Sequence, residues 1–462
     1  MQLKSILQKK SYFLALVSFI GIIAISLMKS AMELEDAEQA YFSQWFRFVY
    51  DDQPPLYTWL QYGINSVFGI SVVSFSLLRA IIFASIIVVL YKFSETYLNE
   101  VTKANLVIFS LAIIPVFIDF TFRRLSHTSL LCLAVVLTYM LLQNLIAKKT
   151  IRNYVLLGVV VAFGVLAKYN YVLVLGAIAL VSFIDEKLRK IIWNKNIIIS
   201  ILITGLLVTP HFYQLLSNQE FLSALRASVE LKTMGQEKTG IPVLSTIFTM
   251  LLTLVKVVLP IFVIFLVFKL FKKVSFNSSR YDWLAKTMFA QLAVIALFFI
   301  FMNVQKTEER WFLPLLLPFL PLLLKSITFG AIKKWETKGF YLFLFILFAQ
   351  AIRTPIEKLL KIPSDVHFGF QPISDVLNSK YANEDWVLPN VTYAGNVKLL
   401  NSRVPVYAAD DFSLPEFLPN KNSAIKVLIG KDGLGDVKVL DSLVDFGRRK
   451  QMIYFIRDDK SQ

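Results

Sequence analysis

Long apolar runs recur along almost the whole chain, and they restrict the possible fold more than any other feature. A membrane helix needs about 20 mostly apolar residues to cross a hydrocarbon core of about 30 Å. Of the 462 residues, 56% are hydrophobic and 17% are charged, whereas average soluble domains carry about 25% charged residues. A soluble chain of this composition would lack the polar residues needed to cover its surface. The sequence therefore predicts an α-helical polytopic membrane protein.

The apolar runs predict about eleven transmembrane helices. The first run follows Lys9 and Lys10, and no small-residue cleavage site comes after it. We therefore expect a retained helix rather than a removed signal peptide. The expected spans are residues 12–30, 70–92, 104–120, 127–147, 151–168, 170–185, 197–215, 242–270, 284–303, 311–330 and 339–353.

Lysine and arginine concentrate in every second short loop between these spans. Basic loops mark the cytoplasmic side of a membrane protein, so this alternation predicts a cytoplasmic N-terminus. These basic loops also explain the formal net charge of +16, so nucleic acid is not an expected partner. The one cysteine, Cys132, lies inside an apolar run, which excludes an intramolecular disulfide framework and a cysteine-based zinc site.

Three segments are then expected on the external side: the first loop (31–69), the loop 210–241 with a helix-like stretch, and the C-terminal segment. The composition changes at Pro355, where turn residues begin to separate short strand-like runs such as 386–388 and 425–429. We therefore predict a transmembrane domain over 1–353 and a small α/β soluble domain over 354–462. We find no internal repeat, which weakens a transporter reading based on repeated halves.

The first external loop contains a concentration of carboxylate side chains. Four carboxylates, Glu33, Glu35, Asp36 and Glu38, crowd one helical turn directly after the first span. Like charges at this spacing repel and raise each other's pKa. The arrangement suits a general base, a metal site or a cationic ligand. The alternative is a solvated interfacial segment whose tyrosines and tryptophans form an aromatic belt.

The order of residues in this loop resembles a known family. Glu35-Asp36-Ala37-Glu38-Gln39 is followed by Gln53-Pro54-Pro55-Leu56-Tyr57-Thr58-Trp59-Leu60. This is similar to the first loop of bacterial membrane glycosyltransferases of the family 39/83 type in the GT-C superfamily. That group includes protein O-mannosyltransferases and the ArnT-like aminoarabinose transferases of lipid A. The pattern is most similar to the branch that adds sugars such as galacturonic acid to lipid A and core.

Later segments fit the same branch, and the resemblance covers about residues 1–350. These segments are Leu125-Ser126-His127-Thr128, Leu166-Ala167-Lys168-Tyr169-Asn170, Thr209-Pro210-His211 and Glu309-Arg310-Trp311 with Pro314. One departure concerns the acidic pair, which is Glu35-Asp36 here and Asp-Glu in the family. Either carboxylate can therefore correspond to the family's catalytic aspartate.

The resemblance implies an inverting glycosyltransferase that moves a sugar from a polyprenyl-phosphate donor to a periplasmic acceptor, preferably lipid A or a related glycolipid. It implies Glu35 or Asp36 as the catalytic carboxylate, and Glu38, Tyr41, Asp52 and Tyr57 as groups that orient the acceptor or the donor. No metal is expected to be obligatory, although the carboxylates offer oxygen ligands to a divalent cation. We expect a monomer in the bacterial inner membrane, surrounded by membrane lipids, with a periplasmic C-terminal domain.

Cations at external helix ends run against the positive-inside bias and are candidates for binding the donor phosphate. The candidates are Arg79, Arg123, Arg124, His127, Lys168, His211 and Arg310, with Lys306 nearby. The alternatives are snorkelling for Lys168 and Arg310 and helix capping for the two histidines. Arg79 lies within the second span, where an ionisable residue usually has a partner, and an acid of the first loop is the expected one.

Two other functions remain open. A protein O-glycosyltransferase would use the same donor class with a Ser or Thr acceptor. A lipid or sugar transporter or flippase would carry ionisable residues in the middle of several spans. In this chain the charged residues concentrate at span ends and in the first loop, which favours an enzyme.

Overall fold

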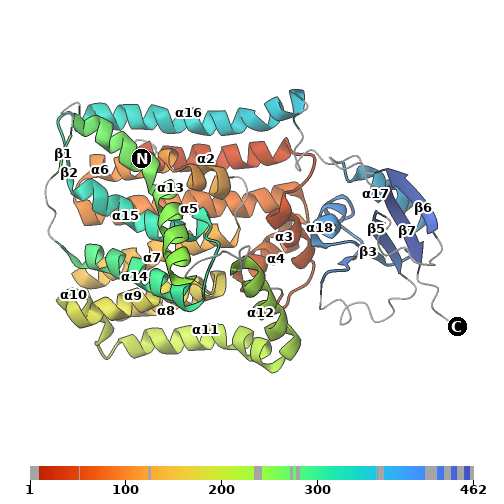
Figure 1. Cartoon of the computed structure of the whole chain (residues 1–462), viewed down its shortest axis with the longest axis horizontal. Coiled ribbons are helices and arrows are strands. Elements are labelled where there is room, and N and C mark those ends of the chain that lie inside the picture. Colours follow the sequence, from red (N-terminus) through yellow and green to blue (C-terminus); the bar gives the residue numbers. More distant parts are fainter. Residues whose placement is uncertain are drawn as a thin grey trace. The chain divides into compact units, whose positions relative to one another are not determined.

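The computed structural model describes residues 10–50, 52–122, 126–233, 242–270, 274–276, 281–360, 362, 369–411, 424–430, 439–444 and 452–457. Among these residues, seven helices are long and apolar enough to cross a membrane. They are α2 (Lys10–Leu27), α5 (Val72–Leu98), α7 (His127–Ala147), α11 (Ile197–Ser217), α13 (Pro242–Leu270), α14 (Trp283–Phe301) and α16 (Ile332–Leu359). The predicted α-helical membrane class is thereby confirmed (Figure 1).

The other expected spans coincide with shorter apolar helices. They are α6 (Val101–Ser110), which continues into the 3₁₀ turn η1 (Leu111–Ile113), and α8 (Ile151–Ala167), α9 (Tyr171–Ile184) and α15 (Leu313–Lys325). A π-helical turn, η2 (Phe117–Thr121), follows η1, and a 3₁₀ turn, η3 (Glu309–Phe312), precedes α15. The last expected span, residues 339–353, is shorter than the helix found there. Helix α16 continues through Pro355 to Leu359.

The chain forms two compact units. The first consists of Met1–Ile20, Asp52–Leu56 and Ala80–Ala349, and the second of Gly21–Asp51, Tyr57–Arg79 and Gln350–Gln462. These bounds differ from the predicted division at residues 353 and 354, which stays a prediction. Several of the boundaries fall inside helices, among them α2, α5 and α16.

Most helices of the first unit run side by side (Figure 1). The short helix α10 (Glu186–Ile192) begins at Asp185, whose carboxylate accepts from the backbone N–H groups of Lys187 and Leu188. Asp282 caps α14 in the same way and forms an ion pair with Lys325 at 2.6 Å. Two short strands, β1 (Val274–Phe276) and β2 (Ile327–Phe329), pair antiparallel. The helix-like stretch expected in the loop 210–241 is α12 (Gln219–Thr233).

The second unit contains a five-stranded sheet in the order β4-β3-β5-β7-β6. Strand β3 (Trp386–Leu388) pairs parallel with β4 (Val406–Ala408) and β5 (Ile425–Ile429), while β7 (Met452–Arg457) pairs antiparallel with β5 and β6 (Val439–Val444). Helices α17 (Gln371–Lys380) and α18 (Val391–Leu400) accompany the sheet. The two runs expected to form strands are β3 and β5, so the predicted α/β character is confirmed.

The first loop folds together with this sheet, which the sequence did not predict. The loop forms α3 (Leu34–Phe42) and α4 (Leu56–Phe68), and one buried core combines Tyr41 and Phe42 of α3 with residues of α18 and the strands. The Met32 backbone N–H donates to Asn396 Oδ1 at 2.7 Å. Helix α3, which carries the acidic pair, is therefore held in place by the C-terminal part of the chain.

Glycine at 395 permits this packing. A Cβ atom added to Gly395 would lie 2.9 Å from the Cα atom of Ala37 and would collide with the Ala37 carbonyl oxygen, because the backbones of α18 and α3 touch there. We expect Gly395→Ala to destabilise the second unit by about 1–3 kcal/mol, as is typical of overpacking. Thermal unfolding of the purified protein measures this loss. The control is Gly63→Ala in α4, where a Cβ meets no atom within 4 Å, so unchanged or slightly higher stability is expected.

Candidate functional site

The acidic pair occupies the first turn of α3. Glu33 precedes the helix in extended backbone, and Glu35 and Asp36 follow in the first turn. Carboxylates are favourable at this position because the helix dipole places partial positive charge at the N-terminus. Asp36 lies on the buried face of α3, whereas Glu35 and Glu38 are half-buried. The two members of the pair therefore have different surroundings, which the sequence left open.

Arg79 of α5 forms an ion pair with Asp36, and both residues are almost fully buried, at 3% and 4% exposure. The expected pairing of Arg79 with an acid of the first loop is confirmed. Arg79 also interacts electrostatically with Tyr57 and Glu33. Because its charge is balanced by Asp36, Arg79 has a strong structural role, and its predicted contact with a donor phosphate stays a prediction.

Tyr57 lies beside this ion pair at the start of α4 and is 2% exposed. Burial raises the pKa of Tyr57 above its ordinary value, and the nearby charges partly cancel, since Arg79 lowers the pKa while Asp36 and Glu35 raise it. The phenol is thus neutral at physiological pH and retains a proton to donate. Of the groups expected to orient substrate, Tyr57 is one that the structure brings to the acidic pair.

A row of buried polar side chains joins α3 to α4. Thr58 donates to the Gln39 side chain at 2.9 Å, and Asn65 donates to Ser43 at 2.8 Å. Gln61 extends the row by donating to Asn65 at 2.8 Å. Hydrogen-bonded polar groups in a buried position fix one relative arrangement of their helices. The row therefore positions the acidic turn of α3 against α4.

The structure places Tyr41 in the core of the second unit. Tyr41 is 1% exposed, and its hydroxyl donates to Asp411 at 2.7 Å, while Arg47 lies 3.6 Å from the same carboxylate. Burial, together with the negative charge of Asp411, raises the pKa of Tyr41 far above its ordinary value. These contacts favour a structural role in holding α3 to the sheet. Its expected role in orienting substrate stays a prediction.

Asp52 belongs to the first unit. Its carboxylate accepts from Ser228 on α12 and from Gln53 at 3.0 Å. The Pro-Pro segment of the first loop is thereby connected to the amphipathic helix α12. Asp52 is thus in a different unit from Glu35 and Asp36.

Three candidate cations of the first unit lie where helices α7, α8 and α11 meet the α8–α9 connection. Lys168 follows the last residue of α8 and donates to Thr128 at 2.8 Å. His127 begins α7 and is 8% exposed. His211 is fully buried within α11, and its Nε2 atom lies 3.0 Å from the hydroxyl of Tyr169. The structure thus brings Lys168 and His127 together, and Tyr169 connects His211 to the same connection.

The remaining candidate cations are more dispersed. Arg310 lies in η3 and forms an ion pair with Glu308 at 2.5 Å. Lys306 is exposed. Arg123 and Arg124 lie outside the described residues.

A cavity of about 340 Å³ adjoins the α8–α9 connection. Its wall is mainly apolar, with Tyr169, Asn170, Gln291 and Trp311 as its principal polar or aromatic members. Among the described residues, the buried Oδ1 atom of Asn170 has no hydrogen-bond partner. A largely apolar cavity with a few polar groups is typical of a small-molecule or lipid site. The sequence analysis did not select these residues, although Tyr169 and Asn170 adjoin Lys168 in the motif that it quoted.

The described residues contain no group of three or more His, Cys, Asp or Glu side chains placed to hold a metal ion. The expectation that no metal is obligatory stays a prediction.

Comparison with known proteins identifies relatives of this chain. Residues 52–213 match the family model described as dolichyl-phosphate-mannose-protein mannosyltransferase. The lipopolysaccharide core galacturonosyltransferases RgtB and RgtA of Rhizobium johnstonii are 24% and 26% identical over 315 and 308 residues. Each alignment covers 66% of this chain, and the chain spans 63% and 61% of the lengths of these relatives.

The fold is similar to that of ArnT from Cupriavidus metallidurans. The TM-score is 0.66 for the crystal structure bound to undecaprenyl phosphate, at 12% identity, and 0.61 for the apo structure, at 11% identity. In both comparisons the similarity covers 96% of this chain and 97% of the other. The chain therefore shares the fold of ArnT. Together with the matching family model and the two relatives, this confirms the resemblance inferred from the first loop.

Proposed function

We propose that this chain is an inverting glycosyltransferase that moves a sugar from a polyprenyl-phosphate donor to a lipopolysaccharide acceptor, with lipid A or core as the preferred target. The observation that carries the proposal is the acidic turn of α3, where Asp36 is fixed by Arg79 and Glu35 is left half-buried beside it. The names of the two Rhizobium relatives and the undecaprenyl phosphate bound to ArnT support the acceptor and donor classes.

In this proposal Glu35 is the catalytic carboxylate and Asp36 is a positioning residue. A general base must reach the hydroxyl whose proton it accepts as the glycosidic bond forms. Asp36 is committed to Arg79 and is only 4% exposed, so Glu35 is the member better placed to meet an acceptor. If the acceptor is a phosphate group, it is already ionised at neutral pH, and the carboxylate orients it rather than deprotonating it.

The departing polyprenyl phosphate needs positive charge to stabilise it as it leaves. We assign this role first to Lys168, since its ammonium group donates to Thr128 and the next two residues, Tyr169 and Asn170, line the cavity. His127 and Arg310 are further candidates. An apolar cavity beside a cation matches a ligand with a phosphate head and a hydrocarbon chain.

Replacing Lys168 by methionine removes the charge but keeps most of the side-chain volume. We expect kcat/KM for the polyprenyl-phosphate sugar to fall about 10- to 100-fold, as a hydrogen bond to a charged group contributes about 1.5–3 kcal/mol. Steady-state kinetics with purified enzyme and varied donor measure this change. Lys195→Met is the matched control, because Lys195 is exposed beyond the other end of α9. Equal losses in both variants would contradict a specific role for Lys168.

We further propose that the chain is a monomer in the bacterial inner membrane, with a cytoplasmic N-terminus and the second unit's sheet in the periplasm. The alternation of basic loops supports this orientation. Fusions of a periplasm-specific reporter after residue 462 and of a cytoplasm-specific reporter before residue 1 test it.

Mass spectrometry of lipid A and core from a strain with the gene and from its deletion tests the acceptor. We expect a mass difference of one sugar residue that disappears in the deletion. Loss of a glycoprotein band with unchanged lipopolysaccharide would instead indicate a protein acceptor. Transport of the donor without any transferred sugar would indicate a flippase.

We also propose that catalysis needs no obligatory metal. Transfer by the purified enzyme should then survive treatment with EDTA, and loss of activity that Mg²⁺ or Mn²⁺ restores would contradict this.

A further inference from the structure

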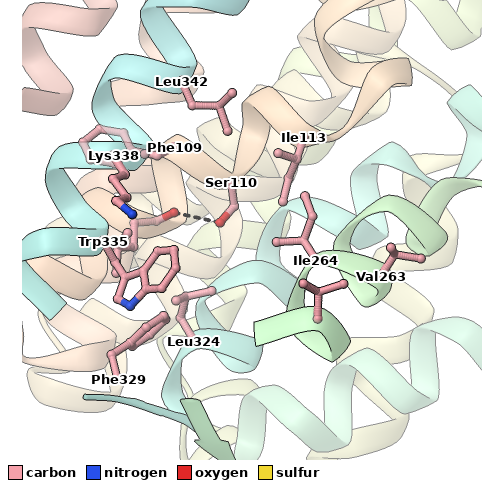
Figure 2. A pocket seen from close by; sticks show the side chains of 13 residues that line it. Phe109, Ser110, Ile113, Val263, Ile264, Leu324, Phe329, Trp335, Lys338 and Leu342 are labelled. Carbon is pink, nitrogen blue, oxygen red and sulfur yellow. Dashed lines mark hydrogen bonds between the residues drawn. The ribbon is translucent and has the colours of Figure 1, made fainter. Parts of the chain in front are cut away.

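A second apolar cavity, of about 390 Å³, lies in the first unit between α6, α13, α15 and α16. It shares no lining residue with the cavity at Tyr169. Figure 2 shows Trp335 and Lys338 of α16 on one side of it and Val263 and Ile264 of α13 on the opposite side. Its volume falls within the range of about 300–1,000 Å³ that ligand pockets occupy.

The interior of this cavity suits a hydrocarbon chain. Its walls come from apolar side chains such as Phe109, Ile113 and Leu342. Ser110 also lines the cavity, but its hydroxyl donates to the Leu106 carbonyl at 2.8 Å within α6, so it is already satisfied (Figure 2). The wall is also closely packed, since a Cβ added to Gly339 would lie 3.0 Å from the Phe109 ring.

The rim of the cavity is cationic and aromatic. The Lys338 ammonium lies 5.3 Å from the centre of the Trp335 ring. Tryptophan with lysine at the end of a membrane helix is typical of the level of lipid headgroups. The rim and the interior together therefore match an amphipathic ligand whose headgroup is anionic.

The charges around the rim also favour an anion. Lys333 and Lys334 are exposed in the first turn of α16, where cations oppose the helix dipole and a bound anion would offset both. The acid on this segment, Glu336, is engaged elsewhere, because it forms an ion pair with Lys10 at 3.2 Å and accepts from Asn105 at 2.7 Å. The excess positive charge at this end of α16 thus remains available to a ligand.

We propose that this cavity binds one anionic phospholipid of the cytoplasmic leaflet, with an acyl chain inside the cavity and the phosphate at Lys338. The orientation proposed above places the start of α16 at that leaflet, which carries anionic lipids. The site is separate from the proposed transfer reaction, so its test does not depend on activity.

Native mass spectrometry of the purified full chain with added phosphatidylglycerol or phosphatidylcholine tests the proposal. We expect the wild type to retain phosphatidylglycerol preferentially. Lys338→Gln should weaken that retention about fivefold, which corresponds to one lysine near an anionic surface. Val267→Trp should abolish it by filling the cavity from a residue that is 39% exposed and lines it.

Two matched controls keep the result specific. Lys358→Gln removes a lysine near the other end of α16, and Phe262→Trp enlarges a side chain on α13 that does not line the cavity. Both should retain phosphatidylglycerol as the wild type does. Equal retention of the two lipids, or unchanged retention in Lys338→Gln and Val267→Trp, would overturn the proposal.

Discussion

Glu35→Gln is expected to lower the rate of sugar transfer about 10²- to 10⁴-fold, the range that a positioned general base contributes. The substitution keeps the size of the side chain and removes its ability to accept a proton. Because Glu35 is only half-buried while Asp36 is buried in the ion pair with Arg79, we expect Glu35→Gln to cost less thermal stability than Asp36→Asn. Single-turnover transfer to purified lipid A or core, at saturating donor, measures the rate.

Asp36→Asn is the matched comparison for this experiment. It breaks the charge balance with Arg79, so we expect it to lower both stability and activity, while Glu35→Gln mainly lowers activity. Full activity of Glu35→Gln, together with a loss in Asp36→Asn that exceeds its effect on folding, would assign the catalytic role to Asp36. Full activity of the double variant would disprove the carboxylate mechanism. A small effect of Glu35→Gln with a phosphate acceptor would fit an orienting role.

Arg79→Ala is expected to have the largest effect on stability. It leaves the Asp36 carboxylate buried at 4% exposure without its ion-pair partner. Removing one partner of a buried ion pair costs about 3–5 kcal/mol, because an uncompensated charge remains. Unfolding followed by fluorescence-detected size exclusion over a temperature series should show the loss in detergent-solubilised protein.

A double substitution separates the charge balance from the chemistry. Replacing both partners by apolar residues of similar size, as in Arg79→Met with Asp36→Leu, removes the unpaired charge and should restore most of the stability. If Asp36 positions the acidic turn, activity should stay low in the double variant although the protein is folded. A double variant as unstable as Arg79→Ala would show that the pair is not the source of the loss.

Much of the membrane part was predictable because its signals are local. A run of about 20 apolar residues forms a membrane helix wherever it occurs, since the bilayer requires internal backbone hydrogen bonds. The helices long enough to cross a membrane all fall on predicted spans, and β3 and β5 fall on the two predicted strands. The weakest prediction was the end of α16, where the composition turns polar at Pro355 while the helix continues to Leu359.

The candidate site was predictable only as a set of residue types. The sequence selected Glu35, Asp36 and Tyr57, and the structure places all three around the first turn of α3 with Arg79. It also selected Tyr41, whose hydroxyl donates to Asp411 in the core of the second unit. Sequence alone does not distinguish an aromatic loop residue that binds substrate from one that packs against a sheet.

The membrane class, the approximate spans and the acidic first loop could all be predicted from sequence, because each depends on neighbouring residues. Tertiary packing, by contrast, pairs Asp36 with Arg79, 43 residues away. It also decided that the first loop shares a core with the C-terminal sheet, where Met32 bonds to Asn396 across 364 residues. Such choices depend on which side chains become buried together, and burial is a property of packing between distant segments rather than of local pattern.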